Sequence, residues 1–243
     1  MTPMTETSEE TSRPALPAVP VLLTAATRWE SRPLAEALGL SAAGAARWEG
    51  SVGGRRLTLV QTGIGAERTA AALARGVAAG DYGLALSAGL CGAMQEGLRS
   101  GDLVADAREA DMDFVVPLRE TARVLGLPLH FGRILHTNVV LQPEAKRRLG
   151  AEHRAVACDM ETQAVRRWAH GTALTVLGVR AVLDEAGQRA PESAPSGDDA
   201  ASLARYALAH AADLPLLAGT GLRSARAMRR LSRFLKAYLE TSR

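Results

Sequence analysis

Three carboxylates stand where the sequence changes from a buried strand to a turn or a helix. Asp159 and Glu161 open an expected helix. Asp184 follows an apolar strand expected over residues 174–182. Burial raises the pKa of a carboxyl group and suits it to proton transfer near neutral pH. First-turn helix charges and ordinary turn residues occupy the same kinds of position, so a catalytic and a structural interpretation both stay open.

Two glycine-rich turns follow expected strands and could bring a ligand close to the backbone. Residues 62–65 (TGIG) join a strand to a helix, and residues 87–93 (SAGLCGA) end another strand. Closely spaced glycines admit an anion, a sugar or a flat ring, and a helix N-terminus attracts negative charge. Arg68 stands where a dinucleotide fingerprint requires a small residue, and no P-loop lysine follows. A tight turn and close helix packing are the structural alternatives.

The elements that must position these residues alternate between strand and helix patterns. Strands are expected over residues 19–23, 56–61, 82–87, 103–105, 114–117, 133–141 and 174–182. Helices are expected over residues 31–40, 67–78, 120–125, 143–149, 160–169 and 200–212. The alternation predicts the α/β class, with a single three-layer αβα domain around a central mixed, largely parallel, twisted sheet. The polar stretch over residues 188–199 is expected to be a mobile loop.

Composition narrows the class of protein. The 243 residues are 47% hydrophobic, 23% charged and 4% aromatic, which allows a substantial core. The formal net charge of +3 is too small to indicate a nucleic-acid partner. Cys91 and Cys158 cannot build a disulfide framework, and no Cys/His run has the spacing of a metal site. No apolar run approaches the roughly 18 residues of a membrane span, so we expect a cytoplasmic protein.

The two ends of the chain differ from its body. Residues 1–18 are rich in Thr, Ser, Glu and Pro and predict a disordered tail before a catalytic domain over residues 19–220. Residues 221–243 predict a basic amphipathic helix, with seven basic residues against one acidic residue. The net charge is +6 for this end and −3 for the rest. Such a helix can lie on an anionic membrane surface or pack its apolar stripe on the domain or on a partner subunit.

In their order along residues 19–217, four motifs resemble those of the purine nucleoside phosphorylase and methylthioadenosine–adenosylhomocysteine nucleosidase superfamily. The motifs are Gly63-Ile64-Gly65, Gly89-Leu90-Cys91-Gly92 with Gly101-Asp102, Asp159-Met160-Glu161, and Arg180 with Asp184. The resemblance implies a small nucleoside substrate, a homodimer or higher homo-oligomer, and no cofactor. Phosphate would be a co-substrate in a phosphorylase.

The resemblance also implies roles for particular residues. Asp184 matches the acid that protonates N7 of the departing purine, and Glu30 matches the residue that activates water. Glu161 matches the carboxylate that grips the ribose hydroxyls, and Met160 packs under the sugar. Two carboxylates would then flank the scissile bond, as glycoside hydrolysis requires. The other substrate-binding residues it implies are Asp159, Gly63, Gly65, Cys91, Gly92 and Val140, and the phosphate-binding candidates are Arg28 and Thr62.

The chain departs from the family pattern at several places. Leu183 precedes Asp184 where the nucleosidases have a serine, and Val140 stands where an aromatic residue stacks on the base. The Gly-Asp-Pro motif of the phosphorylase branch is missing, which favours hydrolysis over phosphorolysis. The alternatives are phosphorolysis of a purine nucleoside to ribose 1-phosphate and base, and a non-catalytic nucleoside-binding scaffold.

Three further segments resemble the hopanoid-associated phosphorylase group. They are residues 184–187 (DEAG), 214–217 (LPLL) and 227–231 (AMRRL). The resemblance implies removal of adenine from adenosylhopane, which is a 5′-substituted adenosine. It also implies a peripheral contact with the inner face of the membrane through the C-terminal helix.

Overall fold

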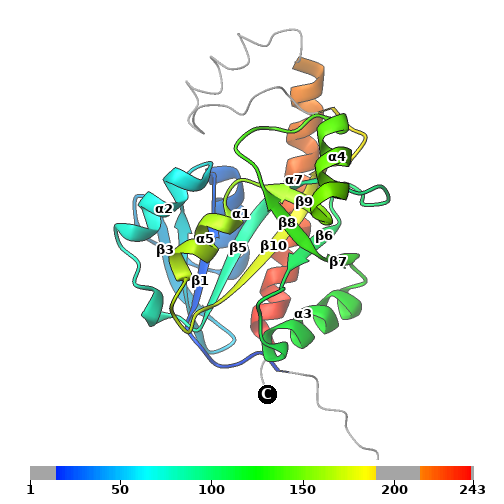
Figure 1. Ribbon diagram of the computed structural model, residues 1–243. Coiled ribbons are helices and arrows are strands. Elements are labelled where there is room, and N and C mark those ends of the chain that lie inside the picture. The colour runs from blue at the N-terminus through cyan, green and yellow to red at the C-terminus, as the bar shows by residue number, and fades with distance from the viewer. Residues whose placement is uncertain (1–14, 190–213, 242–243) are drawn as a thin grey trace, which may run out of the picture.

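The computed structural model describes residues 15–189 and 214–241, in which a twisted sheet lies between layers of helices (Figure 1). The strands are β1 (Val21–Ala25), β2 (Ser41–Gly44), β3 (Arg47–Val52), β4 (Arg55–Gln61), β5 (Leu84–Ala93), β6 (Leu103–Asp106), β7 (Leu129–Phe131), β8 (Arg133–His136), β9 (Ala155–Asp159) and β10 (Thr175–Asp184). The α-helices are α1 (Arg28–Leu38), α2 (Ala66–Ala74), α3 (Met112–Leu125), α4 (Pro143–His153), α5 (Thr162–Ala169) and α7 (Leu214–Glu240). A short 3₁₀ helix covers Ala79–Asp81.

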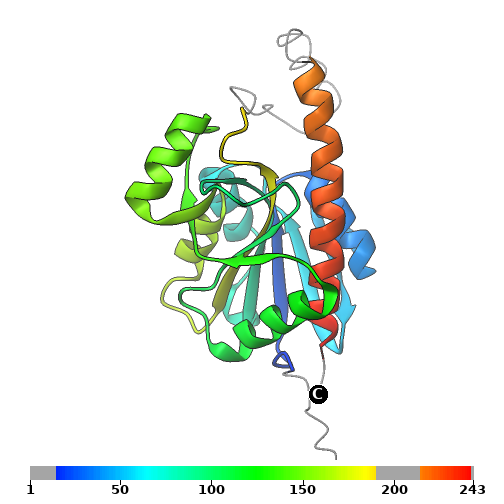
Figure 2. The ribbon, with the colours of Figure 1, turned by 90° about the vertical axis from the view of Figure 1, so that its right-hand side faces the viewer.

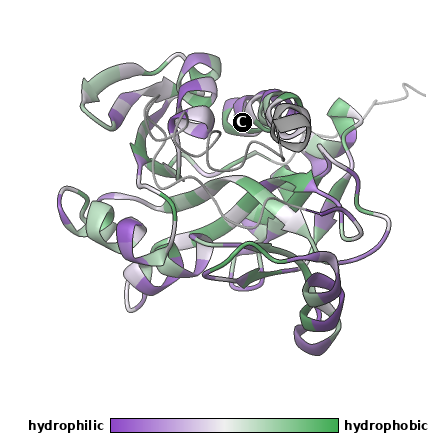
Figure 3. Ribbon diagram, turned by 90° about the horizontal axis from the view of Figure 1, so that it is seen from above, coloured by the Kyte–Doolittle hydropathy of each residue, from purple (hydrophilic) through white to green (hydrophobic). Residues whose placement is uncertain are grey.

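The strands follow the order β2-β3-β4-β1-β5-β10-β6-β7, and β8 joins through β9, which pairs with the end of β5. The central strands β4, β1, β5 and β10 run parallel. The pairs β2–β3, β3–β4 and β10–β6 are antiparallel. The predicted architecture, a mixed and largely parallel sheet within an αβα domain, is therefore confirmed. Hydrophobic residues concentrate along these central strands (Figure 3).

Both faces of the sheet are covered, because successive residues of a strand point to opposite sides. In β1, Val21 and Leu23 pack in the core that α1, α3 and α7 cover, whereas Leu22 packs in the core that α2 and α5 cover. All five residues of β1 are buried. A strand that is buried on both faces reads as a continuous apolar run, which is why the sequence predicts it.

Helix α7 lies along one face of the sheet (Figure 2) and contributes to the main core. Its apolar stripe is at most 1% exposed and consists of Ala227, Met228, Leu231, Phe234, Leu235, Tyr238 and Leu239. The Tyr238 hydroxyl donates a hydrogen bond to the Phe114 carbonyl at 3.0 Å. Of the two alternatives for this helix, the structure shows packing on the domain. The apolar face that would insert into a membrane is buried, and the expected division at residues 220 and 221 falls inside α7.

Several expected elements differ from those observed. Residues 114–117, expected as a strand because of their β-branched valines, lie in α3, where Phe114, Leu118 and Ala122 form one buried helical face. The strand expected over residues 133–141 ends at His136. The sequence did not predict the hairpin of β2 and β3, or strands β7 and β9. These strands are short, and β2 is exposed, so they lack a marked apolar pattern.

Some expectations lie outside the described residues. They concern residues 1–14 of the expected tail, residues 190–199 of the expected loop and the helix expected over residues 200–212. None of the helices that the structure describes is both long and apolar enough to cross a membrane.

Candidate active site

The candidate site lies at the carboxyl ends of the central parallel strands, where open α/β sheets bind ligands. Glu30 comes from α1, which follows β1, and Gly65 precedes α2, which follows β4. Glu161 precedes α5, which follows β9, and β10 supplies both Arg180 and Asp184. The topology thus gathers side chains that are far apart in the sequence at one edge of the sheet.

Arg180 is the centre of one half of this site and is 1% exposed. Its Nη2 lies 2.7 Å from Asp159 Oδ2 and 3.6 Å from Glu161 Oε2. Nη2 also donates to Ser87 Oγ at 2.8 Å and to Thr162 Oγ1 at 3.2 Å. Burial opposes its charge, but the surrounding carboxylates raise the pKa of Arg180 above its ordinary value. Among the described residues, its Nε and Nη1 have no hydrogen-bond partner.

Glu30 is buried beside Arg180 and is held by four donors. Its Oε2 accepts from the backbone N–H groups of Ala26 and Thr27, both at 3.0 Å, and from Thr27 Oγ1 at 3.2 Å. Its Oε1 accepts from the Leu90 N–H of β5 at 2.8 Å. The residue therefore completes a capping box at the start of α1 and also fixes a carboxylate against the central sheet.

Gly89 lets these two groups approach each other across β5. A Cβ at Gly89 would lie 2.7 Å from Arg180 Nη1 and 2.9 Å from Glu30 Cδ, inside ordinary contact distance. Its φ of +153° is one that residues with a side chain rarely adopt. Glycine at this position is therefore required by the close approach of Glu30 and Arg180.

Glu161 is the third carboxylate near Arg180, after Asp159 and Glu30. Its Oε1 accepts from the Gly65 N–H at 2.8 Å, and the φ of Gly65 is +94°. Burial, together with the nearby charges of Asp159 and Glu30, raises the pKa of Glu161 to about 7, although Arg180 opposes the shift. The carboxyl group can therefore change its protonation state near neutral pH.

Asp184 lies in the other half of the site and pairs with a buried lysine, Lys146 of α4. Burial raises the pKa of Asp184, while the positive charges of Lys146 and Arg223 oppose the shift. Gly92 of β5 lies against this pair, since a Cβ there would be 3.2 Å from Asp184 Oδ2 and 3.5 Å from Lys146 Cε. Gly89 and Gly92 therefore place the backbone of β5 between the two charged halves.

The structure also places the other residues that the sequence singled out. Asp159 binds Arg180 and accepts hydrogen bonds from the Thr162 backbone and hydroxyl groups. The Thr62 hydroxyl donates to the carbonyls of Ala25 and Gly63. The Arg28 guanidinium lies 5.3 Å from the ring centroid of Trp29.

The remaining predicted residues line the strand ends or the turns after them. Cys91 is buried, and burial raises the pKa of its thiol well above the ordinary value. Gly63 has a φ of +87° and lies against the Arg68 side chain. Met160 follows β9, and Val140 lies between β8 and α4; both are half-buried.

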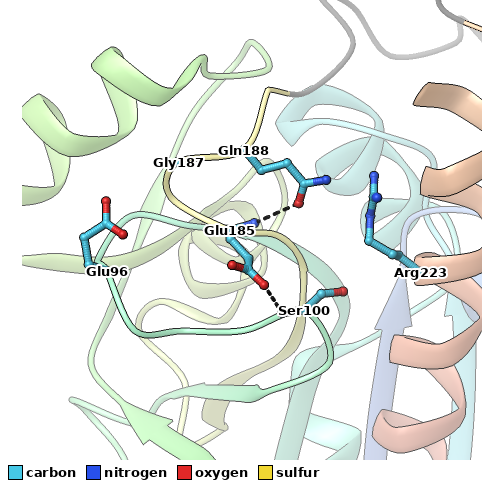
Figure 4. Close-up of a pocket in the computed structure, with 6 residues that line it drawn as sticks. All are labelled: Glu96, Ser100, Glu185, Gly187, Gln188 and Arg223. Atoms are coloured by element: carbon cyan, nitrogen blue, oxygen red, sulfur yellow. Dashed lines mark hydrogen bonds between the residues drawn. The ribbon is translucent and has the colours of Figure 1, made fainter. Parts of the chain in front are cut away.

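A cavity of about 490 Å³ lies beside the turn that follows Asp184. Its lining residues, shown in Figure 4, are Glu96, Ser100, Glu185, Gly187, Gln188 and Arg223. Glu185 Oε1 accepts from the Ser100 N–H at 3.4 Å, and the Glu185 N–H donates to Gln188 Oε1 at 3.4 Å. The turn is thereby tied to the loop between β5 and β6. Within residues 15–189 and 214–241, no three His, Cys, Asp or Glu side chains are grouped so that they could hold a metal ion.

Sequence reasoning missed the contacts of Lys146 and did not identify Arg180 as a central residue. Arg180 was part of a motif, but its position in a strand gave no sign that it would gather Asp159, Glu161 and Ser87. Lys146 did leave a signal, because the chain has two lysines against 27 arginines. A lysine in such a sequence is a candidate for a role that arginine cannot fill.

Comparisons with known proteins concern the family and the fold of the chain. Residues 20–128 match the family model of the phosphorylase superfamily. No curated protein matches the chain in sequence. A solved 5′-methylthioadenosine/S-adenosylhomocysteine nucleosidase from Streptococcus pneumoniae, with a transition-state inhibitor, is 19% identical and has a TM-score of 0.69. That similarity covers 91% of this chain and 98% of the nucleosidase.

Two further solved structures share the fold. The corresponding nucleosidase from Campylobacter jejuni is 16% identical, with a TM-score of 0.70 over 92% of this chain and 100% of its own. The futalosine hydrolase of Helicobacter pylori is 15% identical, with a TM-score of 0.64 over 90% of this chain and 96% of its own. The fold is the one that these solved nucleosidases share. The family match over residues 20–128 and the shared fold agree with the predicted superfamily.

Proposed function

We propose that this enzyme hydrolyses the N-glycosidic bond of a 5′-substituted adenosine and releases adenine. The observation that carries the proposal is the division of the site into two charged halves across the glycines of β5. Glu30, Glu161 and Arg180 form one half, and Asp184 with its lysine forms the other. A nucleoside between them would have its sugar at the first half and its base at the second.

Asp184 is the proposed general acid. Because burial raises its pKa, the carboxyl group can keep a proton at a pH where an exposed aspartate has lost it. Asp184 would give this proton to N7 of the purine as the bond from C1′ to N9 breaks. The electron pair of that bond leaves with the base, which departs as neutral adenine.

Glu161 and Glu30 have separate proposed roles on the sugar side. The negative charge of Glu161 would stabilise the positive charge that develops on the ribose, and its carboxylate would accept from the ribose hydroxyls. Water would be held between Glu30 and the Nη1 of Arg180, which lacks a partner in the described part of the chain. Glu30 would take a proton from this water as its oxygen bonds to C1′.

The charge balance favours hydrolysis over phosphorolysis. Glu30, Asp159 and Glu161 surround the single guanidinium of Arg180, so this half of the site carries net negative charge. At an effective dielectric constant of 20, two like charges about 4 Å apart repel by about 4 kcal/mol. A phosphate dianion would meet this repulsion, whereas neutral water would not.

Product analysis tests the proposal. The purified enzyme is incubated with 5′-methylthioadenosine with and without phosphate, and adenine and the sugar product are separated by chromatography. Hydrolysis predicts equal rates and free 5-methylthioribose in both conditions. Absolute dependence on phosphate, with a sugar 1-phosphate as product, would support the phosphorolysis alternative. Binding without turnover would support the scaffold alternative.

For the 5′ substituent we propose a bulky apolar group, with adenosylhopane as the candidate. Support comes from the sequence resemblance to the hopanoid-associated group, and the names of the solved relatives include nucleosidases for 5′-substituted adenosines. Competition by 5′-alkyl adenosines of increasing chain length tests this substituent. Rising affinity with length is expected, and loss of binding beyond a short chain would contradict it.

We further propose a homo-oligomer that contacts anionic lipid through the outer face of α7. Arg226, Arg229 and Arg233 are exposed there, while the apolar stripe of the helix is buried. Each basic residue near such a surface contributes about 1 kcal/mol, and salt screens the attraction. Co-sedimentation with anionic vesicles should therefore occur at low salt and be lost at high salt. Light scattering after gel filtration measures the oligomeric state.

A further inference from the structure

Lys146 is a buried cation that the mechanism above does not use. Its side chain is 1% exposed, and it lies in α4. The only other lysine of the chain, Lys236, is 51% exposed and forms a helix-surface pair with Glu240. Burial of an ammonium group costs several kcal/mol unless its charge and its donors are matched. The contacts of Lys146 therefore indicate which groups the buried ammonium charge stabilises.

All three donors of the Lys146 ammonium group can be used within one turn. Its Nζ pairs with Asp184 Oδ2 and donates to the Glu185 carbonyl at 3.1 Å and to the Gln188 carbonyl at 3.5 Å. These acceptors span residues 184–188, so one side chain from α4 ties together the whole turn that carries Asp184. The contacts cross 38 residues of sequence between Lys146 and Asp184.

We propose that Lys146 is a positioning residue for Asp184, which fixes the orientation of the acid and sets the pH range in which it acts. This inference rests on the proposed function. It also explains how the chain manages with Leu183 before Asp184, because the lysine supplies a donor from another element. Lysine suits the position better than arginine, since a compact ammonium group can serve three acceptors that a planar guanidinium fork does not match.

Four elements place charged or titratable groups around Asp184. They are Lys146 of α4, Arg223 of α7, Cys91 of β5 and Cys158 of β9. Burial raises the pKa of both thiols, which therefore stay neutral at pH 7. Lys146 and Arg223 are thus the cations that favour the ionised form of Asp184. Removing Lys146 leaves the effect of burial opposed mainly by Arg223, so the pKa of Asp184 rises.

The test compares Lys146→Met and Lys146→Arg with Lys236→Met as a matched control. Adenine release from 5′-methylthioadenosine is followed from pH 5 to pH 10. Lys146→Met is expected to lower kcat/KM by about 10- to 100-fold, since misplacing a reacting group by about 1 Å can cost 100-fold. In Lys146→Met, the basic limb of the pH profile of kcat/KM, where Asp184 loses its proton, should move to higher pH. Lys146→Arg keeps the charge, so kcat should fall while the basic limb stays near its wild-type position.

An unmoved basic limb in Lys146→Met would overturn the inference, whatever the size of the rate loss, because a merely structural role does not change this limb. Circular dichroism checks that each variant is folded, and Lys146→Gln provides a second neutral variant if Lys146→Met is not. Asp184→Asn distinguishes a failure of the proposed function from a failure of the role proposed for Lys146. Full activity in Asp184→Asn would refute the proposed function itself. An inactive Asp184→Asn with a wild-type Lys146→Met would refute only the role of Lys146.

Discussion

Replacement of Gly89 by alanine is a sharp test of the geometry on the sugar side of the site. The added Cβ would lie 2.7 Å from Arg180 Nη1, which is about 0.7 Å short of the ordinary contact distance of 3.4 Å. It would also press on the Glu30 carboxylate. Both groups are buried and hydrogen-bonded to neighbouring elements, so neither can move without losing contacts. The substitution therefore separates the two groups proposed to hold water.

The expected loss follows from the size of this displacement. A shift of about 1 Å in a reacting group can lower the rate about 100-fold, and we expect a fall in kcat of about that size for Gly89→Ala. KM should change less, because the base side of the site is untouched. Steady-state adenine release at saturating and limiting substrate separates the two constants.

A matched control separates the clash from backbone strain. Gly54 has a φ of +76°, and a Cβ there would meet no atom within 4 Å. Gly54→Ala therefore carries strain of about 1–3 kcal/mol without a clash and lies in the turn between β3 and β4. Both variants should have a lower Tm, but only Gly89→Ala should lose kcat. Wild-type kcat in Gly89→Ala, or an equal loss in both variants, would refute the reasoning.

Two further predictions concern pH dependence and stability. The pKa of Glu161 is raised to about 7, so a fall in pH through 7 protonates this carboxylate. Below pH 7, kcat/KM should therefore fall about tenfold per pH unit. Glu161→Gln should abolish this acidic limb of the pH profile and lower activity at every pH. Arg55 is buried and donates to carbonyls of Pro17, Gly53, Leu239 and Thr241 at 2.9 to 3.0 Å. Arg55→Met should therefore lower the free energy of unfolding, measured by urea denaturation, by about 3 kcal/mol or more. The control is Arg56→Met at the exposed neighbouring residue, and an equal loss of stability in the two variants would contradict this prediction.

The parallel core of the fold could be predicted from the sequence because burial on both faces leaves a direct trace. The apolar runs of β1 and β10 have few competing interpretations. The valines of residues 115 and 116 were misleading, since β-branched residues favour strands but here belong to the buried and exposed sides of α3. Tertiary packing of Phe114 and Leu118 outweighed local propensity.

The candidate site was predictable as a set of motifs but not as a set of contacts. The glycine turns and carboxylates mark strand ends, and the topology brings strand ends together. The hydrogen bond from Leu90 to Glu30 spans 60 residues, and the one from Gly65 to Glu161 spans 96. Nothing in local sequence encodes such pairings. The same holds for the burial of the stripe of α7, where an amphipathic pattern alone fits a membrane surface and a protein core equally well.

The most direct test of the central claim is adenine release by wild-type enzyme and Asp184→Asn in phosphate-free buffer. With 5′-methylthioadenosine as substrate, we predict that the wild type forms adenine and 5-methylthioribose in equal amounts. Asp184→Asn should be folded and at least about 100-fold slower, because it cannot supply the proton to N7. Failure of the wild type to release adenine from any 5′-substituted adenosine, or full activity in Asp184→Asn, would contradict the account.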